Sequence, residues 1–286
     1  MNRWITGARP RTLPAAIVPV AVGASAAVGE PTDVVWWRVA AALVVSLMLQ
    51  LGVNFANDYS DGVRGTDDVR VGPIRLVASG LASPSSVKRA ALLSFGIAAV
   101  AGLAIALSTS LVLLLVGAAA IAAGWFYTGG PRPYGYLGLG EVFVFVFFGL
   151  VATAGTTYAA IESVTALSFV MGCAVGALAC ALLVINNLRD IPTDREVGKR
   201  TLAVRLGDQR TRWFYVALIG SAFVLSGAGA LWRTPVLLGL VAIPLAVRPT
   251  RLVLGGASGG ALIPVLGETG RLQLAWGLLV TVGLAV

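Results

Sequence analysis

Long apolar runs, each closed by polar or charged residues, recur along this sequence of 286 residues. Many of them reach the roughly 20 residues that a helix needs to cross a lipid bilayer. Charged residues make up only 12% of the chain, against about 25% in a typical soluble domain. The sequence therefore predicts an all-α polytopic membrane protein.

The apolar runs divide the chain into successive spans. We expect nine transmembrane helices, at about 12–29, 37–57, 87–107, 110–127, 141–160, 165–187, 212–232, 235–248 and 272–286. The eighth is short, and the Gly-rich stretch from Arg251 to Arg271 is expected to hold a half-helix or an interfacial segment. The sequence has no long polar linker, so residues 1–286 are predicted to form one domain. The basic N-terminus leads into the first span without a convincing cleavage site, so we do not interpret it as a signal peptide.

Basic residues are distributed unevenly between the two sides of the predicted bundle. With a cytoplasmic N-terminus, all 21 Lys and Arg residues except Arg38 and Arg233 fall on the cytoplasmic side. Segments rich in Lys and Arg tend to remain in the cytoplasm. We therefore expect a multi-pass protein of the cell membrane with its N-terminus inside. The net charge of +8 is attributed to these loops and to anionic substrates or lipids, and not to nucleic-acid binding.

Two acidic clusters lie at the ends of the second and sixth predicted spans, on the expected cytoplasmic side. They contain six of the 13 acidic residues, namely Asp58, Asp61, Asp67, Asp68, Asp190 and Asp194. The spacings of Asp58 to Asp61 and of Asp190 to Asp194 put each pair on one helix face. Asn54 and Asn186 each lie one turn earlier. Each helix end therefore offers a short column of oxygen ligands.

These oxygen columns favour a hard cation. The chain has no His, and its two cysteines are interpreted as packing residues. Mg²⁺ prefers one or two carboxylates together with waters and substrate phosphate oxygens. Two facing columns suit Mg²⁺ ions that bridge a diphosphate. The alternative is that Asp and Asn simply end two helices in water.

Basic residues follow each acidic cluster in the sequence. Arg64, Arg70 and Arg75 follow the first cluster, and Lys199 and Arg200 follow the second. Such cations can clamp phosphate oxygens and stabilise a diphosphate leaving group. The alternative for any one of them is ordinary loop charge.

Aromatic residues are concentrated between the fourth and fifth spans, from Trp125 to Tyr136. Aromatic rings beside a diphosphate site would stabilise a carbocation by cation–π attraction. The alternative is an aromatic belt at the membrane interface.

The motif residues resemble the UbiA superfamily of intramembrane prenyltransferases. Asn57-Asp58-x-x-Asp61 and Asp190-x-x-x-Asp194 match the motifs that follow the second and sixth helices of that family. Where the usual first motif has a further Asp, this chain has Gly65, with Asp67 or Asp68 just beyond. The segments Tyr127-Thr128-Gly129-Gly130-Pro131 and Asn186-Asn187-x-Arg189-Asp190 are similar to the branch that acts on 1,4-dihydroxy-2-naphthoate.

This resemblance implies a fold and a set of site residues. The fold would be nine transmembrane helices around a central cavity, embedded in the lipid bilayer, with a cytoplasmic cap above the active site. The implied substrates are a polyprenyl diphosphate and 1,4-dihydroxy-2-naphthoate, and the implied cofactor is Mg²⁺. The expected metal ligands are Asp58, Asp61, Asp67, Asn186, Asp190 and Asp194; the four aspartates of the paired motifs, with Lys199, form the expected catalytic set. The expected diphosphate contacts are Asn57, Arg64, Arg75, Asn186, Lys199 and Arg200, and the expected acceptor contacts are Arg9, Tyr127, Arg132 and Tyr134.

Two other functions remain open from the sequence. One is a related prenyltransferase with another acceptor, such as hydroxybenzoate, homogentisate, haem or a phosphosugar. The other is a divalent-cation transporter, since carboxylates within a membrane bundle also mark ion pathways.

Overall fold

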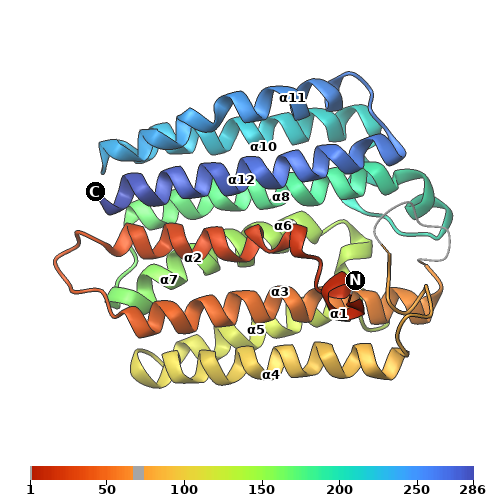
Figure 1. Cartoon of the computed structure of the whole chain (residues 1–286), viewed down its shortest axis with the longest axis horizontal. Helices are drawn as coiled ribbons and strands as arrows, with labels where there is room; N and C mark the ends of the chain where they lie inside the picture. The colour runs from red at the N-terminus through yellow and green to blue at the C-terminus, as the bar shows by residue number, and fades with distance from the viewer. Residues whose placement is uncertain (1, 67–73) are drawn as a thin grey trace.

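The structure is a computed structural model that describes residues 2–66 and 74–286. Its helices run side by side along one long axis (Figure 1). The first half of the chain contains α1 Arg3–Ala8, a 3₁₀ turn Pro10–Thr12, α2 Pro14–Ala27, α3 Trp36–Arg64, α4 Pro84–Ser108 and α5 Val112–Phe126. A 3₁₀ turn at Tyr134–Leu137 leads into α6 Gly140–Val144, a π-helical segment Phe145–Val151 and α7 Ala152–Ile161. These last three form one continuous helical run.

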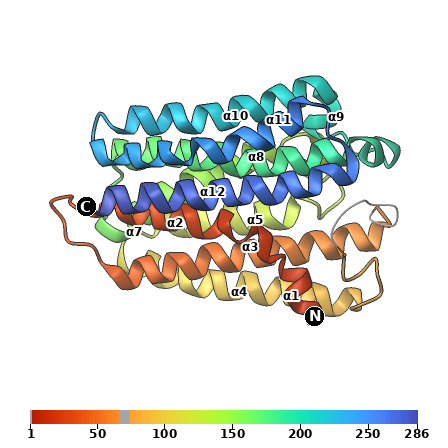
Figure 2. The same cartoon turned by 45° about the horizontal axis from the view of Figure 1, so that its top comes forward.

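The second half of the chain continues the bundle. It contains α8 Ala166–Glu196, the short α9 Leu202–Leu206, α10 Asp208–Gly229, a 3₁₀ segment Thr234–Ala242, α11 Ile243–Leu254, a 3₁₀ turn Gly259–Ala261 and α12 Leu262–Ala285. Helix α3 ends at Arg64 and α8 at Glu196, at one end of the bundle that we call the motif end. Figure 2 shows α1 and α9 at this same end, whereas the C-terminus lies at the other.

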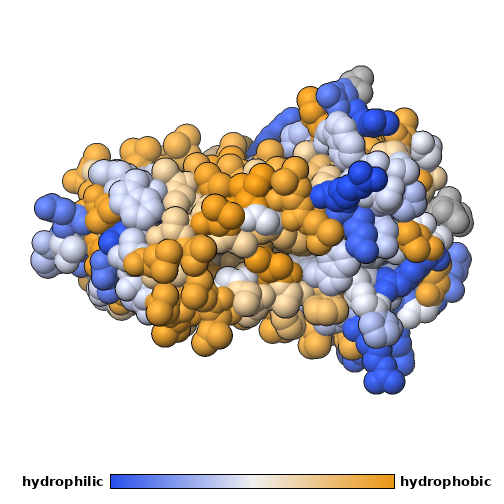
Figure 3. Space-filling view, turned by 90° about the horizontal axis from the view of Figure 1, so that it is seen from below, coloured by the Kyte–Doolittle hydropathy of each residue, from blue (hydrophilic) through white to orange (hydrophobic). Residues whose placement is uncertain are grey.

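Each expected span overlaps a helix or a continuous helical run of the described residues, and several expected spans extend one to three residues beyond the observed helix ends. Six of these are long and apolar enough to cross a membrane: α3, α4, the run from α6 to α7, α8, α10 and the run from Thr234 to Leu254. Helices α2 and α5 are apolar but shorter. Apolar side chains form a band around the middle of the face in Figure 3, and polar ones gather towards its two ends. The fold is that of an integral membrane protein.

The expectation of a half-helix or interfacial segment between Arg251 and Arg271 was wrong. Helix α11 continues to Leu254, and α12 begins at Leu262, ten residues before the predicted span. The chain turns between them at glycines, among them Gly256 with φ +88°, a region that side chains rarely adopt. Glu268 concealed the start of α12 in the sequence because it adds charge to an apolar run. In the structure it pairs with Arg248 at 2.9 Å.

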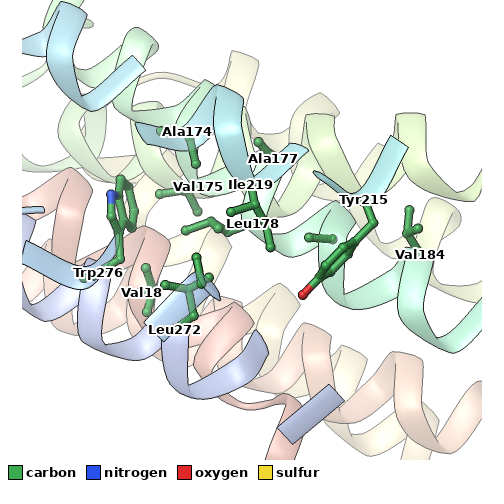
Figure 4. Close-up of a cluster of buried hydrophobic side chains, with 14 of the residues drawn as sticks. Val18, Ala174, Val175, Ala177, Leu178, Val184, Tyr215, Ile219, Leu272 and Trp276 are labelled. Carbon is green, nitrogen blue, oxygen red and sulfur yellow. The ribbon is translucent and has the colours of Figure 1, made fainter. Parts of the chain in front are cut away.

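The core of the bundle is built around α8. This helix packs against α2, α7, α10 and α12, and Figure 4 shows its Val175 and Leu178 among side chains of α2, α10 and α12, including Val18, Tyr215 and Trp276. Helix α3 instead packs chiefly against α4, α5, α2 and α7. Helices α3 and α8 have almost no direct contact with each other, so the two motifs are carried by different parts of the bundle.

Small residues bring the π-helical segment close to α8. A Cβ atom on Gly149 would lie 2.5 Å from Gly176 Cα and 2.8 Å from the Gly172 carbonyl oxygen. Those atoms belong to the backbone and cannot turn away. Gly172-x-x-x-Gly176 is thus a small-residue contact of the kind that lets membrane helices approach closely.

We predict that Gly149→Ala destabilises the folded protein by about 1–3 kcal/mol, because an added methyl group overpacks this crossing. The measurement is thermal unfolding of the purified protein in detergent. The matched control is Gly220→Ala on α10, where a Cβ atom meets nothing within 4 Å. Equal unfolding temperatures for the two variants would contradict the close crossing.

Candidate active site

One large cavity, of about 970 Å³, extends along the bundle from the motif end. Helices α3, α5 and α8 and the run from α6 to α7 contribute most of its walls. Its motif end is polar, whereas side chains such as Val45, Val116 and Phe147 line its deeper part. The cavity therefore suits a molecule with an anionic head and a long apolar tail.

Helix α3 supplies one polar wall of the cavity. Gln50, Asn54, Asn57 and Asp61 all line it, at spacings of three or four residues that keep them on one helix face. Asn57 Oδ1 accepts a hydrogen bond from the Thr128 hydroxyl at 2.8 Å. The adjacent polar residues Gln50 and Asn54 bond to each other at 3.2 Å.

Asp58 lies away from this face. Its side chain is fully buried and does not line the cavity. Its two oxygens accept hydrogen bonds from the backbone N–H groups of Leu76 and Val77, at 2.8 and 3.0 Å. Asp58 therefore anchors the segment before α4, including the neighbouring Arg75, which does line the cavity.

Helix α8 supplies the opposite polar wall, with Asn186, Asn187, Asp190 and Asp194. The Asp190 carboxylate receives two hydrogen bonds from Arg189, at 2.6 and 2.8 Å, in a buried ion pair. Asn187 Nδ2 donates to Glu141 Oε1 at 2.8 Å. The Asn187 amide is thus held by a buried carboxylate of α6.

Tyr136 connects the two walls. Its hydroxyl donates to Asp61 Oδ1 at 2.6 Å, and its ring centroid lies 4.7 Å from Lys199 Nζ. Lys199 Nζ also lies 3.5 Å from Asp61 Oδ1. Burial, followed by the negative charge of Asp61, raises the pKa of Tyr136 well above its ordinary value. The phenol therefore remains protonated at neutral pH and remains a donor.

A third polar group surrounds Arg9, between α1 and the first 3₁₀ turn. Arg9 has a left-handed backbone, with φ +51°, which is uncommon for a residue other than glycine and points to a local constraint. Its guanidinium donates to the Asn54 carbonyl oxygen at 3.3 Å, while Asn54 Nδ2 donates to the Ala8 carbonyl at 3.0 Å. Arg9 thereby lines the cavity near the polar wall of α3.

Most of the predicted site residues meet in this cavity. Those that line it are Arg9, Asn57, Asp61, Arg75, Tyr127, Tyr134, Asn186, Asp190, Asp194 and Lys199. Arg64, Arg132 and Arg200 are exposed and do not line it. Arg64 instead donates to the carbonyl oxygens of Thr128 and Gly130. Asp67 lies outside the described residues.

The lining also includes residues that the sequence predictions omitted. Tyr136, Asn187 and Arg189 all face the cavity. Asn187 and Arg189 lie within the second motif segment. Their positions next to Asp190 on the same helix could have identified them as site residues. Tyr136 lies in the aromatic segment, but nothing in its spacing identifies Asp61 as its partner.

The donors at the motif end fit Mg²⁺. The described residues include no group of three or more Asp, Glu, His or Cys side chains that would hold a metal unaided. The cavity instead presents separate carboxylate and amide oxygens on two walls. Among the described residues, the contacts given above for Asp61 fall on Oδ1, so Oδ2 is available as a ligand. This arrangement suits Mg²⁺ bound through few carboxylates together with substrate phosphate oxygens.

The fold and the cavity define an integral membrane protein with a site for an amphipathic, anionic molecule. A model of the UbiA prenyltransferase family matches residues 16–258. The chain therefore belongs to the UbiA prenyltransferase family.

Curated relatives resemble the chain over nearly its full length. A Mycobacterium tuberculosis protein named 1,4-dihydroxy-2-naphthoate octaprenyltransferase is 52% identical, over 99% of this chain and 97% of its own length. An Escherichia coli protein of the same name is 35% identical, over 98% of this chain and 94% of its own length.

Solved structures share the fold at low sequence identity. A UbiA homologue from Aeropyrum pernix has a TM-score of 0.71 and 16% identity, with 94% of this chain and 96% of that chain covered. A UbiA homologue from Archaeoglobus fulgidus, bound to DMAPP and Mg²⁺, has a TM-score of 0.63 and 16% identity, with 98% of this chain and 100% of that chain covered.

We predict that Asp58→Ala loosens the segment before α4. The change leaves the N–H groups of Leu76 and Val77 without their carboxylate acceptor, at a cost of about 1–3 kcal/mol for each buried group. Limited trypsin digestion in detergent should then cut after Arg75 faster than in the unmodified protein. The exposed Asp33 provides the control variant Asp33→Ala. Unchanged cleavage after Arg75 would argue against an anchoring role for Asp58.

Proposed function

We propose that this protein transfers a polyprenyl group from a polyprenyl diphosphate to 1,4-dihydroxy-2-naphthoate, a step in menaquinone biosynthesis. The observation that carries the proposal is that one cavity has two oxygen-donor walls and cations at one end and an apolar remainder. The names of the full-length relatives support the acceptor.

The polar end of the cavity binds the diphosphate in this proposal. Lys199 and Arg75 are buried cations at the cavity wall, where charge-assisted hydrogen bonds to phosphate oxygens are strong. Asn57 and Asn186 contribute amide groups from the two walls. The exposed Arg64 and Arg200 act more indirectly, through the loop carbonyl oxygens and the backbone that they hold.

Asp61, Asp190 and Asp194 hold Mg²⁺ in this proposal, with Asn186 in support. When bound, Mg²⁺ neutralises the diphosphate and makes it a better leaving group. Arg189 restrains the Asp190 carboxylate, and Tyr136 and Lys199 restrain that of Asp61. Asp58 supports the site by holding the Arg75 segment.

The aromatic acceptor occupies the space near Arg9, Tyr127 and Tyr134. The Arg9 guanidinium pairs with the carboxylate of the acceptor, and the two tyrosine rings, which contact each other edge to face with centroids 5.5 Å apart, lie beside its ring. The bond between the first prenyl carbon and the diphosphate oxygen breaks. A carbon–carbon bond forms at the ring, and the acceptor carboxylate leaves as carbon dioxide. Positive charge that develops on the prenyl group is stabilised by the nearby aromatic faces.

The bilayer arrangement completes the proposal. The chain crosses the cell membrane nine times, with its N-terminus and the motif end on the cytoplasmic side. The described residues 74–83 before α4 and the segment after α8 form part of a cap over the diphosphate end. The apolar part of the cavity holds the prenyl tail beside the lipid.

We predict that the purified protein, given Mg²⁺, 1,4-dihydroxy-2-naphthoate and a labelled polyprenyl diphosphate, forms a prenylated product, and that EDTA abolishes the reaction. Asp61→Asn should lower kcat by about 10²–10³-fold, because it removes a ligand of the cation that stabilises the charge on the departing diphosphate. Asp33→Asn, at the opposite end, is the control.

An acceptor panel of hydroxybenzoate, homogentisate and 1,4-dihydroxy-2-naphthoate tests the named acceptor in the same assay. Preference for another acceptor would overturn the substrate assignment. Metal-independent turnover would overturn the site. Flux of Mg²⁺ through proteoliposomes without product formation would favour a transporter.

We also predict that the Gly117→Phe variant binds prenyl donors with long tails less well than donors with short tails. Gly117 lines the apolar part of the cavity, and an added Cβ atom meets nothing within 4 Å, so a larger side chain fits but occupies tail space. The KM for long polyprenyl diphosphates should rise more than the KM for dimethylallyl diphosphate. Gly220→Phe on α10, outside the cavity, is the matched control. Equal effects on long and short donors would contradict this location of the tail.

A further inference from the structure

The two helices that carry the polar walls of the site pack against different neighbours. Asp61 is on α3 and Asp190 is on α8, and these helices scarcely touch. A site shared between them needs a part that fixes their relative position, because small errors in the placement of ligands cost metal affinity and rate.

Tyr136 reaches both walls from the loop between α5 and α6. On the α3 side, its hydroxyl donates to Asp61 at 2.6 Å and lies 3.5 Å from the Thr66 hydroxyl. On the α8 side, its carbonyl oxygen accepts from the Arg200 N–H group at 3.0 Å. Its ring centroid also lies 4.7 Å from Lys199 Nζ. Its side chain and backbone thus bind the end of α3 and the segment after α8.

The ring of Tyr136 also organises the cations around the site. Besides Lys199, the Arg64 guanidinium carbon lies 5.6 Å from the ring centroid. A cation within about 6 Å of an aromatic face is attracted by the ring quadrupole. The ring therefore restrains Lys199 in the cavity wall, within 3.5 Å of Asp61.

The hydroxyl and the ring of Tyr136 act on different parts of the site. A hydrogen bond to one oxygen of a carboxylate orients the other towards a metal, and partners of this kind are typically worth 10–100-fold in metal affinity or activity. Tyr136 bonds to Oδ1 of Asp61, which leaves Oδ2 as the oxygen for the metal. The hydroxyl thus acts on metal binding through Asp61, while the ring acts on the diphosphate through Lys199.

We propose that Tyr136 is a positioning residue that joins the two halves of the site, by orienting Asp61 through its hydroxyl and Lys199 through its ring. This inference rests on the proposed function. It adds a residue outside both acidic motifs whose two parts control metal binding and diphosphate binding separately.

The test uses Tyr136→Phe and Tyr136→Leu in the full-length protein in detergent. Binding of Mn²⁺, as a spectroscopic substitute for Mg²⁺, is followed by loss of the free-ion EPR signal in the presence of inorganic diphosphate, independently of turnover. Tyr136→Phe keeps the ring and should weaken Mn²⁺ binding about 10-fold, with little change in the KM for the prenyl donor at saturating metal. Tyr136→Leu should also raise that KM. Tyr158→Phe, on α7 and outside the cavity lining, is the matched control.

A double-mutant cycle separates positioning from general damage. In an Asp61→Ala background, Tyr136→Phe should have no further effect on Mn²⁺ binding, since the alanine already removes both the acceptor of the Tyr136 hydroxyl and the ligand through which it acts. Unchanged Mn²⁺ affinity in Tyr136→Phe, or additive losses in the double variant, would overturn the role of Tyr136. If the unmodified protein binds Mn²⁺ and diphosphate but prenylates no acceptor, the proposed function fails while the role of Tyr136 is still decided by these binding data.

Discussion

Asp61 lies in a bundle with an apolar outer band, and its negative charge is held there by one hydroxyl and one ammonium group. A carboxylate removed from water is costly unless it is paired and hydrogen-bonded. The same requirement explains the contact between Asp190 and Arg189 and the two backbone donors on Asp58. Each buried carboxylate needs a hydrogen-bond donor or a cation beside it, and this need determines which side chains meet at the motif end. The site is therefore arranged around its carboxylates.

The two acidic motifs are carried by two parts of the bundle with different packing partners. Helix α8 is buried among α2, α10 and α12 and carries the second motif on a well-packed support. Helix α3 packs with α4 and α5 and carries the first motif. The cavity lies between these groups, and Tyr136 of the α5–α6 loop and Lys199 after α8 line its polar end. This division leaves room for a long apolar molecule without breaking the main core.

The sequence predicted the apolar helical runs and most of the residues that line the polar end of the cavity, because both depend on local pattern. Apolar runs indicated where the membrane spans lie. The helical spacing of the two motifs indicated that Asn57 and Asp61 share one helix face and Asn186 and Asp190 another, and all four residues line the cavity. The different roles of Asp58 and Asp61 were not predictable, since each step along a helix turns the side chain by about 100° and only packing decides which face meets the cavity. Tyr136 and Arg64 act through irregular loops, where no periodicity relates a residue to its partner.

The π-helical segment at Phe145–Val151 gives the cavity a straight wall. Phe143, Phe147, Val151, Gly155 and Ala159 all line the cavity at intervals of four residues. In a regular α-helix such a series rotates by about 40° at each step, or about 160° over its length, and would turn its last members away. A π-turn takes in one more residue than an α-turn and so offsets about 100° of this rotation. One irregular turn therefore keeps a single helical run in contact with the same channel through most of the depth of the bundle.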